Sequence, residues 1–292
     1  MKKFKSVFTE RSIVRRYCAG DSFSSRSFVA RLFPFAVLLF TAFLFFSCES
    51  NDGPIAVNKN INLKSNSKSL VEFFTNTSCV ACPPPGHFLD LIDSLQGITI
   101  NDTNVIIIRY HTAVFANDPY YLHNTLDNQG RCDYYYAPNT YNPVTYLMGQ
   151  ALPSYSFSVW QSLFNTQLAT INDFGIDIVI TYNPVSRTGT ADIDFGQLTG
   201  QSISDLKMHV ALTESEILYA APNGESVHQN TLRKLLTGPS GQSVSIQPGQ
   251  TQSFSFNFSV DNIINAANCD IVVFVQSDAG QIVYGVEKKR LP

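Results

Sequence analysis

Apolar residues first gather in one run near the N-terminus, directly after a basic segment. Eight Lys and Arg residues precede residues 32–46, which are apolar except at two positions. This length is short for a membrane span and typical of the apolar region of an export signal. The run ends at Ser47 and Cys48, the small residue and cysteine that lipoprotein signal peptidases prefer. We predict a lipoprotein signal peptide over residues 1–48, with Cys48 carrying lipid, palmitate included; an uncleaved anchor or a plain secretory signal is the alternative.

Beyond a polar stretch at residues 49–68, which we predict to be a flexible tether, strand and helix patterns alternate. Strand segments are rich in β-branched residues, and helical segments carry apolar residues three or four positions apart. The successive segments are residues 70–74 (strand), 85–95 (helix), 104–110 (strand), 124–136 (helix), 142–149 (strand) and 158–171 (helix). This alternation predicts an α/β domain over residues 69–172.

From residue 174 onward, apolar residues recur at every second position, which is the pattern of half-buried strands. Turn residues such as Asn-Pro and Pro-Gly separate the segments. The strand segments are residues 176–181, 188–195, 206–212, 252–260 and 271–276. Several short strands in succession predict an all-β domain over residues 173–292, built as an Ig-like sandwich.

The charge balance narrows the classes of partner. The whole chain has a net charge of −3, but eight of its 20 basic residues lie before Cys48. Without residues 1–48, 12 basic and 21 acidic residues remain. An acidic chain without a basic patch is a poor ligand for nucleic acid or for anionic lipid. We therefore expect no nucleic-acid partner, and membrane contact through the lipid anchor alone.

The segment Cys79-Val80-Ala81-Cys82 lies between a predicted strand and a predicted helix. Two cysteines at this spacing and junction are typical of a redox site that exchanges disulfides. The unpaired amides and dipole of a helix N-terminus favour a thiolate, so Cys79 is the expected nucleophile. Cys82, one turn into the helix, is placed to resolve the mixed disulfide.

A permanent disulfide between Cys79 and Cys82 is the main alternative to a working redox pair. A zinc site is disfavoured because the sequence has no second Cys-x-x-Cys and no His pair at zinc spacing. It also has no Gly-rich phosphate loop, so we predict neither a metal nor a cofactor. An additional bridge between Cys132 and Cys269 stays open, because sequence does not fix connectivity.

Other residues have a chemical and a structural interpretation. Pro143, at the head of a strand, is a candidate for a cis peptide bond, with Pro138 as the weaker candidate. His111 ends a central strand near the Cys pair and could stabilise a thiolate, or it could be a hydrogen-bonded structural histidine. Arg131 could bind a carboxylate or pack over neighbouring tyrosines.

The order of strand, Cys-Val-Ala-Cys, helix, strand and Pro143 resembles the thioredoxin superfamily over residues 69–170. The resemblance implies that a cis-proline faces the Cys pair and helps to hold an extended substrate. The chain departs from the family pattern in three places. Ser78 stands where an aromatic residue usually precedes the motif, Phe73 stands where a buried acid is expected, and Glu72 falls on the opposite face of the strand.

Larger blocks of sequence give a closer resemblance. They include the strand that leads into Cys79, the blocks around His111, Asp118, Arg131 and Pro143, and residues 228–233 and 273–276. Together they resemble the lipoprotein family of outer membrane protein 28 over residues 70–290. The resemblance implies a thioredoxin-like domain followed by a β-rich domain at the outer membrane.

The sequence thus supports two hypotheses from different classes. The first is a lipid-anchored outer-membrane protein that exchanges disulfides with exported proteins or peptides through Cys79 and Cys82. The second is a surface binding or adhesion lipoprotein in which the Cys pair is a structural disulfide. The reduction potential of the pair distinguishes the two hypotheses.

Overall fold

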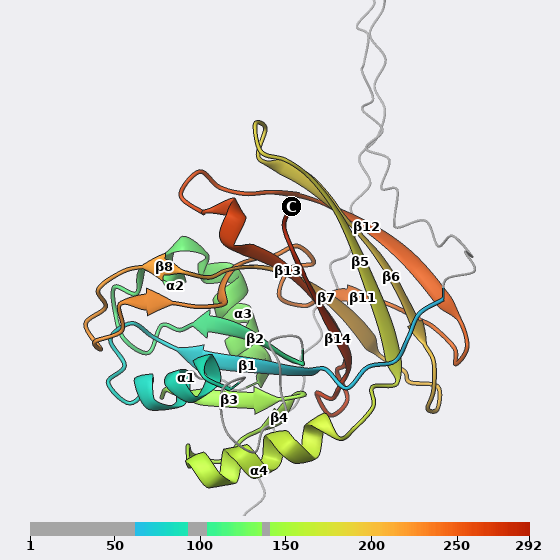
Figure 1. Cartoon of the computed structure of the whole chain (residues 1–292), viewed down its shortest axis with the longest axis horizontal. Helices are drawn as coiled ribbons and strands as arrows, with labels where there is room; N and C mark the ends of the chain where they lie inside the picture. The colour runs from blue at the N-terminus through green and yellow to red at the C-terminus, as the bar shows by residue number, and fades with distance from the viewer. Residues whose placement is uncertain (1–61, 93–103, 136–140) are drawn as a thin grey trace, which may run out of the picture. The chain divides into compact units, whose positions relative to one another are not determined.

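The central sheet is built around two parallel strands from the N-terminal half. A computed structural model describes residues 62–92, 104–135 and 141–292 (Figure 1). Cys48, the predicted signal peptide, most of the predicted tether and Pro138 lie outside the described residues. The described residues all belong to one compact unit.

The first half of the described chain contains β1 and β2, two strands whose seven residues each are all buried. They pair in parallel, and β3 pairs with β1 on its other side in antiparallel orientation. The elements in order are β1 (Ser69–Thr75), α1 (Pro83–Asp90), β2 (Val105–His111), α2 (Pro119–His123), α3 (Thr125–Tyr135), β3 (Val144–Leu147), β4 (Gln150–Ala151) and α4 (Phe157–Leu168).

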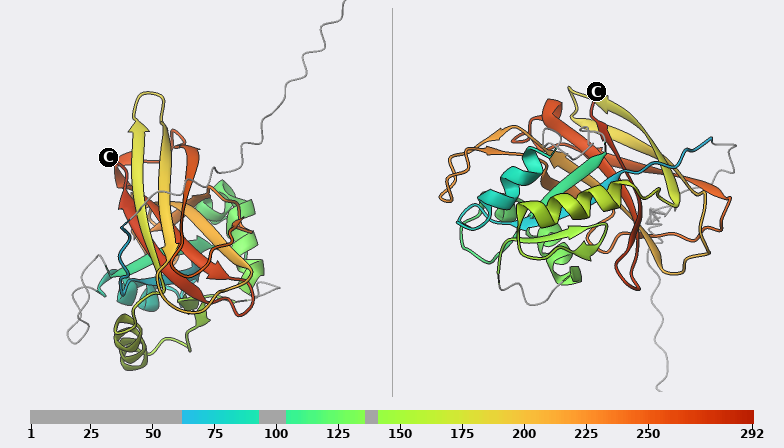
Figure 2. Two further views of the ribbon diagram at one scale, coloured as in Figure 1. Left: turned by 90° about the vertical axis from the view of Figure 1, so that its right-hand side faces the viewer. Right: turned by 60° about the horizontal axis from the view of Figure 1, so that its bottom comes forward.

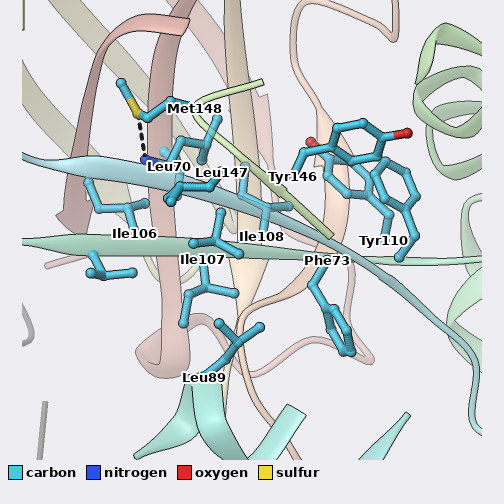
Figure 3. Close-up of a cluster of buried hydrophobic side chains, with 14 of the residues drawn as sticks. Leu70, Phe73, Leu89, Ile106, Ile107, Ile108, Tyr110, Tyr146, Leu147 and Met148 are labelled. Carbon is cyan, nitrogen blue, oxygen red and sulfur yellow. Dashed lines mark hydrogen bonds between the residues drawn. The ribbon is translucent and has the colours of Figure 1, made fainter. Parts of the chain in front are cut away.

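Helices cover both faces of this part of the sheet. On one face, Phe88 of α1 packs edge to face against Trp160 of α4, with ring centroids 5.7 Å apart. On the other face, Arg131 of α3 binds Glu72 of β1. Figure 3 shows the buried side chains of β1, β2 and α1, where the Met148 sulfur accepts a hydrogen bond from the Leu70 amide. The alternation predicted for residues 70–171 therefore corresponds to real elements.

The second half is mostly strand, as the period-two pattern predicted. All five predicted strand segments are present, as β5, β6, β7, β12 and β13. The elements are β5 (Phe174–Asn183), β6 (Thr188–Gln197), β7 (Leu206–Glu214), β8 (Ile217–Leu218), β9 (Val227–His228), β10 (Thr231–Leu235), β11 (Gln242–Ser243), β12 (Thr251–Ser259), the 3-10 helix η1 (Ala266–Asn268), β13 (Cys269–Ser277) and β14 (Val283–Arg290).

One sheet runs through both halves of the chain. Its strand order is β14-β13-β7-β10-β2-β1-β3-β4, with β11 also paired to β7. The link is β10, which pairs in parallel with β2 and in antiparallel orientation with β7. The domain division after residue 172 stays a prediction, and the main sheet continues across it.

A second sheet, in the order β12-β6-β5, packs over the C-terminal part of the main sheet (Figure 2). The strands β7 and β13 are therefore buried on both faces. On β13, Val272 and Phe274 enter the core shared with α1 and β1, whereas Ile271, Val273 and Val275 enter the core beneath β5 and β6. This double burial explains why β13 is a nearly continuous apolar run.

Within residues 62–92, 104–135 and 141–292, no helix has both the length and the apolar character to cross a bilayer.

Candidate functional site

Cys79 and Cys82 form a disulfide in the loop between β1 and α1, and their Cα atoms are 5.4 Å apart. The Cys79 amide donates to the Asn76 carbonyl at 2.9 Å, and the Cys82 amide donates to the Cys79 carbonyl at 3.2 Å. Both cysteines are buried, with 1% and 0% of their surface exposed, while Val80 between them is 82% exposed. The sulfurs thus lie beneath an exposed loop tip.

Three prolines open the helix that follows the disulfide. Cys82 is the N-cap of α1, and Pro83, Pro84 and Pro85 occupy its first turn. Proline suits this place because the first amides of a helix have no partner within the helix. It also removes the N–H groups that would stabilise an anion there. The next amide, that of Gly86, already donates to the Cys82 carbonyl at 3.0 Å. A Cys79 thiolate therefore receives no hydrogen bond from the amides of residues 83–85.

The peptide bond between Asn142 and Pro143 is cis, as predicted. Val144 lies opposite Phe74 in the β1–β3 register, so Pro143 lies beside the end of β1, where the Cys loop begins. The Asn142 side chain donates to Thr112 Oγ1 at 2.6 Å, and Asn76 Nδ2 donates to the Thr112 carbonyl at 2.8 Å. These bonds hold the Cys loop, the loop after β2 and the Pro143 loop together.

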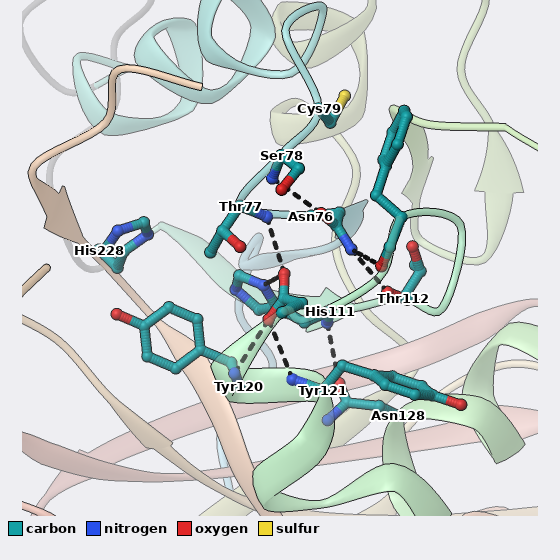
Figure 4. A network of polar contacts seen from close by, with 12 residues as sticks. Asn76, Thr77, Ser78, Cys79, His111, Thr112, Tyr120, Tyr121, Asn128 and His228 are labelled. Atoms are coloured by element: carbon teal, nitrogen blue, oxygen red, sulfur yellow. Dashed lines mark hydrogen bonds and ion pairs between the residues drawn. The ribbon is translucent and has the colours of Figure 1, made fainter. Parts of the chain in front are cut away.

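His111 takes part in a buried network below the Cys loop (Figure 4). Its Nδ1 lies 2.8 Å from Asp118 Oδ2, which also accepts the Thr77 amide at 2.7 Å. Burial alone would raise the pKa of Asp118, but the hydrogen bonds from His111 and from backbone amides lower it below its ordinary value. Asp118 is therefore a stable carboxylate that fixes both His111 and the Cys loop.

The geometry supports the structural interpretation of His111. Its ring packs against Tyr120 with centroids 4.6 Å apart, and no hydrogen bond or ion pair in the described part of the chain joins it to either cysteine. The His111 amide donates to Asn128 Oδ1 at 2.9 Å. His111 therefore acts on the Cys loop through Asp118 and Thr77.

The hairpin of β8 and β9, from the C-terminal half, also touches the Cys loop. The Asn223 amide, at the hairpin turn, donates to the Thr77 carbonyl at 3.0 Å. His228 of β9 packs against Tyr120, and its Nε2 donates to the Tyr219 carbonyl at 3.1 Å. Burial, with His111 nearby, lowers the pKa of His228. The site is thus assembled from both halves of the chain.

Glu72 and Phe73 occupy opposite faces of β1, as expected from strand geometry. Phe73 packs against Gly86 of α1, and the Arg109 guanidinium lies 5.5 Å from the centre of its ring. Glu72 accepts from Arg131 at 2.6 Å and from the Tyr135 hydroxyl. The Glu72 carboxylate is therefore held by Arg131 and Tyr135 on the face of β1 opposite Phe73.

Arg131 combines both of its expected interactions. It binds a carboxylate, that of Glu72, and its guanidinium carbon lies 4.6 Å from the ring centre of Tyr134. It also donates to Gln276 Oε1 at 3.1 Å, which ties α3 to β13. Arg131 therefore joins the two halves of the fold and is not available to a ligand.

The bridge left open between Cys132 and Cys269 does not form, since neither cysteine is part of a disulfide and both are buried. Cys132 belongs to the core around β1, and Cys269 belongs to the core beneath the second sheet. Burial raises the pKa of Cys269 to about 12. Among the described residues, no group of three His, Cys, Asp or Glu side chains is arranged to hold a metal ion.

Sequence reasoning missed Asp118, Asn76 and Asn223 as residues that hold the Cys loop. Asp118 had a local signal, since an Asp followed by Pro119 is a common helix start, and its side chain caps α2 by accepting from Tyr120 and Tyr121. Asn223 had no local signal, because the residue it contacts, Thr77, lies in the other half of the sequence.

Comparison with known proteins supports the resemblance to the family of outer membrane protein 28. Residues 150–292 match the model of the family described as outer membrane protein Omp28. HBP35 of Porphyromonas gingivalis is similar in structure, with a TM-score of 0.64 and 15% identity over 78% of this chain and 76% of that chain. This level of identity shows a shared fold only.

A domain of the outer membrane lipoprotein Omp28 from Porphyromonas gingivalis also matches in structure, with 19% identity. That match covers 41% of this chain and 88% of that chain, with a TM-score of 0.31. No curated protein matches the chain in sequence.

Proposed function

We propose that this protein is an outer-membrane lipoprotein whose thioredoxin-like part, residues 69–172, exchanges disulfides with exported proteins or peptides. One observation carries the proposal. A Cys79–Cys82 disulfide lies in the loop between the buried strand β1 and the helix α1, next to the loop that contains Pro143. The parallel β1–β2 pair with antiparallel β3 supports the thioredoxin-like assignment.

The exchange starts from the reduced pair. The Cys79 thiolate attacks one sulfur of a substrate disulfide, which forms a mixed disulfide and releases one substrate thiolate. The Cys82 thiolate then attacks the Cys79 sulfur, releases the second substrate thiolate and forms the disulfide seen here. Two protons from the cysteine thiols end on the substrate thiols, so the substrate is reduced and the protein is oxidised. The reverse steps transfer the disulfide to a substrate dithiol.

The surroundings favour the oxidised pair. Pro83, Pro84 and Pro85 offer no amide to a thiolate, and no carboxylate lies at residue 73 to move a proton. A reduced pair without these stabilising groups returns readily to the disulfide. We therefore expect the reduction potential of this pair to lie near about −270 mV, the most reducing value of the range for exchange. Pro143 contacts an extended substrate in this proposal, and His111 positions the Cys loop through Asp118.

A second candidate function is a binding or adhesion lipoprotein in which the disulfide only closes the loop. The burial of both cysteines favours it, because an attacking thiolate must reach a sulfur that is at most 1% exposed. Exchange would require Val80 and Ala81 to move first, so that a substrate could reach the sulfurs.

The reduction potential of the pair separates the two candidates. Exchange predicts a value between about −120 and −270 mV, whereas a structural disulfide lies below about −300 mV. Cys82→Ser leaves Cys79 without its resolving partner, so it should accumulate mixed disulfides with exported proteins. Cys79→Ser is the matched control and should trap few. If neither variant traps a partner and the potential is below about −300 mV, exchange is excluded.

We also propose that Cys48 is the lipid attachment site. A basic segment, a short apolar run and Ser47 before Cys48 support it, as does the family match of residues 150–292. Cys48→Ser should abolish labelling with radioactive palmitate and release the chain from the outer-membrane fraction. Unchanged labelling of Cys48→Ser would contradict the assignment.

A further inference from the structure

The strand β12 ends the second sheet with a long, regular edge. Its nine residues pair with β6 in continuous register, from Thr251 opposite Gly196 to Ser259 opposite Thr188. Within the described chain no strand pairs with its other side. The sequence TQSFSFNFS contains no charged residue and no proline. Natural sheets usually protect an edge with charges, prolines, bulges or short strands, and β12 has none of these.

The other sheet edges are protected. β4 has two residues, and the Gln281 carbonyl lies directly against the adjacent Gly149. β14 carries four consecutive charged residues, Glu287 to Arg290. Leu63 and Lys64 lie against Gly175 of β5. Compared with β4, β14 and β5, β12 is a long edge strand without charge, bulge or proline, which indicates an edge open to pairing.

The two faces of β12 alternate cleanly. Phe254 and Phe258 are buried in the core, and the half-buried Phe256 stacks on Phe254 with ring centroids 6.3 Å apart. Ser255 and Asn257 are exposed on the outer face, where the Ser255 hydroxyl donates to Asp192 at 2.7 Å. An added strand would meet phenylalanines on its inner side and small polar groups on its outer side.

We propose that a second copy of this chain pairs with β12, antiparallel, about a two-fold axis at Ser255. In this register Phe254 faces Phe256 of the second copy, and Ser255 faces its own equivalent, so over residues 253–257 each face meets a matching face. Because β12 is uncharged, no like charges meet across the axis. Asp192 and its equivalent lie three strand spacings apart, about 14 Å, beyond the screening length of about 8 Å at physiological salt.

The partner is a second copy because the strand complements itself. A two-fold axis at Ser255 places Phe254 opposite Phe256 and Ser253 opposite Asn257 of the second copy, so the central five residues of β12 complement themselves. Farther from the axis, Gln252 lies opposite Phe258. An interface of one strand pair is small, so we expect a weak dimer that depends on concentration.

A cysteine at the axis tests this directly in the full chain, purified in mild detergent. The four cysteines that the structure describes do not interfere, since Cys79 and Cys82 are bonded and Cys132 and Cys269 are buried. In Ser255→Cys the two new Cβ atoms face each other at about 4.5–5.5 Å, so mild oxidation should give a cross-linked dimer on a non-reducing gel. Ser259→Cys is the matched control, because its equivalents lie about 26 Å apart in this register.

A charge at the edge gives a second, independent measurement. Phe256→Lys should weaken dimerisation about tenfold or more by sedimentation equilibrium, equivalent to ~1.4 kcal/mol, because it buries an unpaired ammonium against Phe254 of the second copy. Val179→Lys, on the outer face of β5, should leave dimerisation unchanged.

The proposal is overturned if Ser255→Cys cross-links no better than Ser259→Cys. It is also overturned if Val179→Cys, on β5, cross-links while Ser255→Cys does not. A chain that stays monomeric while another exported protein binds β12 would overturn it as well.

Discussion

His209 illustrates how much a single buried side chain can control. Its ring stacks on Phe274 with centroids 4.7 Å apart, Gly241 lies against it, and neither ring nitrogen has a hydrogen-bond partner among the described residues. Burial, together with the positive charges of Arg131 and Lys207, lowers the pKa of His209 well below its ordinary value. The folded protein therefore keeps His209 neutral.

This predicts an acid-sensitive fold. The unfolded chain protonates His209 below its ordinary pKa of about 6.5 and the folded chain does not, so stability is complete above that pH and falls as the pH decreases. The loss approaches about 1.4 kcal/mol per pH unit until the folded pKa is reached. In His209→Phe, the free energy of unfolding measured in urea should change less between pH 6.5 and pH 5 than in the wild type. In His87→Gln, where the replaced side chain is exposed, it should depend on pH as in the wild type. The same pH dependence of the free energy of unfolding in the wild type, His209→Phe and His87→Gln would contradict this prediction.

Arg131 and Glu72 show what residue-level reasoning from sequence can reach. Strand periodicity placed Glu72 opposite Phe73, and this was confirmed. It could not supply the partner, because Arg131 lies 59 residues away on α3. The cysteines outside the Cys79–Cys82 disulfide show the opposite case, since the spacing of Cys132 and Cys269 in the sequence does not reveal that they lie in different cores.

Among the elements, the five-residue helix α2 stabilises the Cys loop through its N-cap residue. Its N-cap, Asp118, accepts the amides of Tyr120 and Tyr121 as well as the Thr77 amide and His111. One carboxylate thus starts a helix and fastens the Cys loop. Because the pKa of Asp118 is lowered, its contribution to the stability of the fold is present above the ordinary pKa of Asp. That contribution is lost as the pH falls through the lowered pKa.

We predict that Asp118→Ala destabilises the protein by about 2–3 kcal/mol, since it removes a cap and leaves buried donors unpaired. It should also speed reduction of the Cys79–Cys82 disulfide by dithiothreitol, because Thr77 loses its anchor. Asn265→Ala, which removes the cap of η1, should cost about 1 kcal/mol and leave the reduction rate unchanged. An unchanged reduction rate in Asp118→Ala would remove Asp118 from the site.

At the scale of the whole molecule, β10 decides how the chain unfolds. It lies between β2 and β7, so neither half can complete the main sheet alone. The sheet carries cores on both of its faces at β7 and β13. We therefore expect both halves to unfold together.

Separation of the chain after residue 172 tests this expectation. Each fragment would expose an unpaired strand edge, at β2 in one and at β10 in the other, so both should aggregate or stay unfolded when expressed apart. A proteolytic cut beside Gly224, whose surroundings are open, should leave the fold intact. Two independently folded fragments, each with a cooperative transition, would show that the sheet link is dispensable.

The sequence by itself determined the type and order of most elements, the strand faces, the Cys motif and the cis-proline, because these follow from local periodicity and local chemistry. Only the tertiary structure decided that one sheet joins the two halves, that the site takes Asn223 from the second half, and that Cys132 and Cys269 stay apart. Such features depend on pairings between distant segments. β10 is the clearest case: five residues with no strong local pattern join the two halves because their backbone groups meet β2 on one side and β7 on the other.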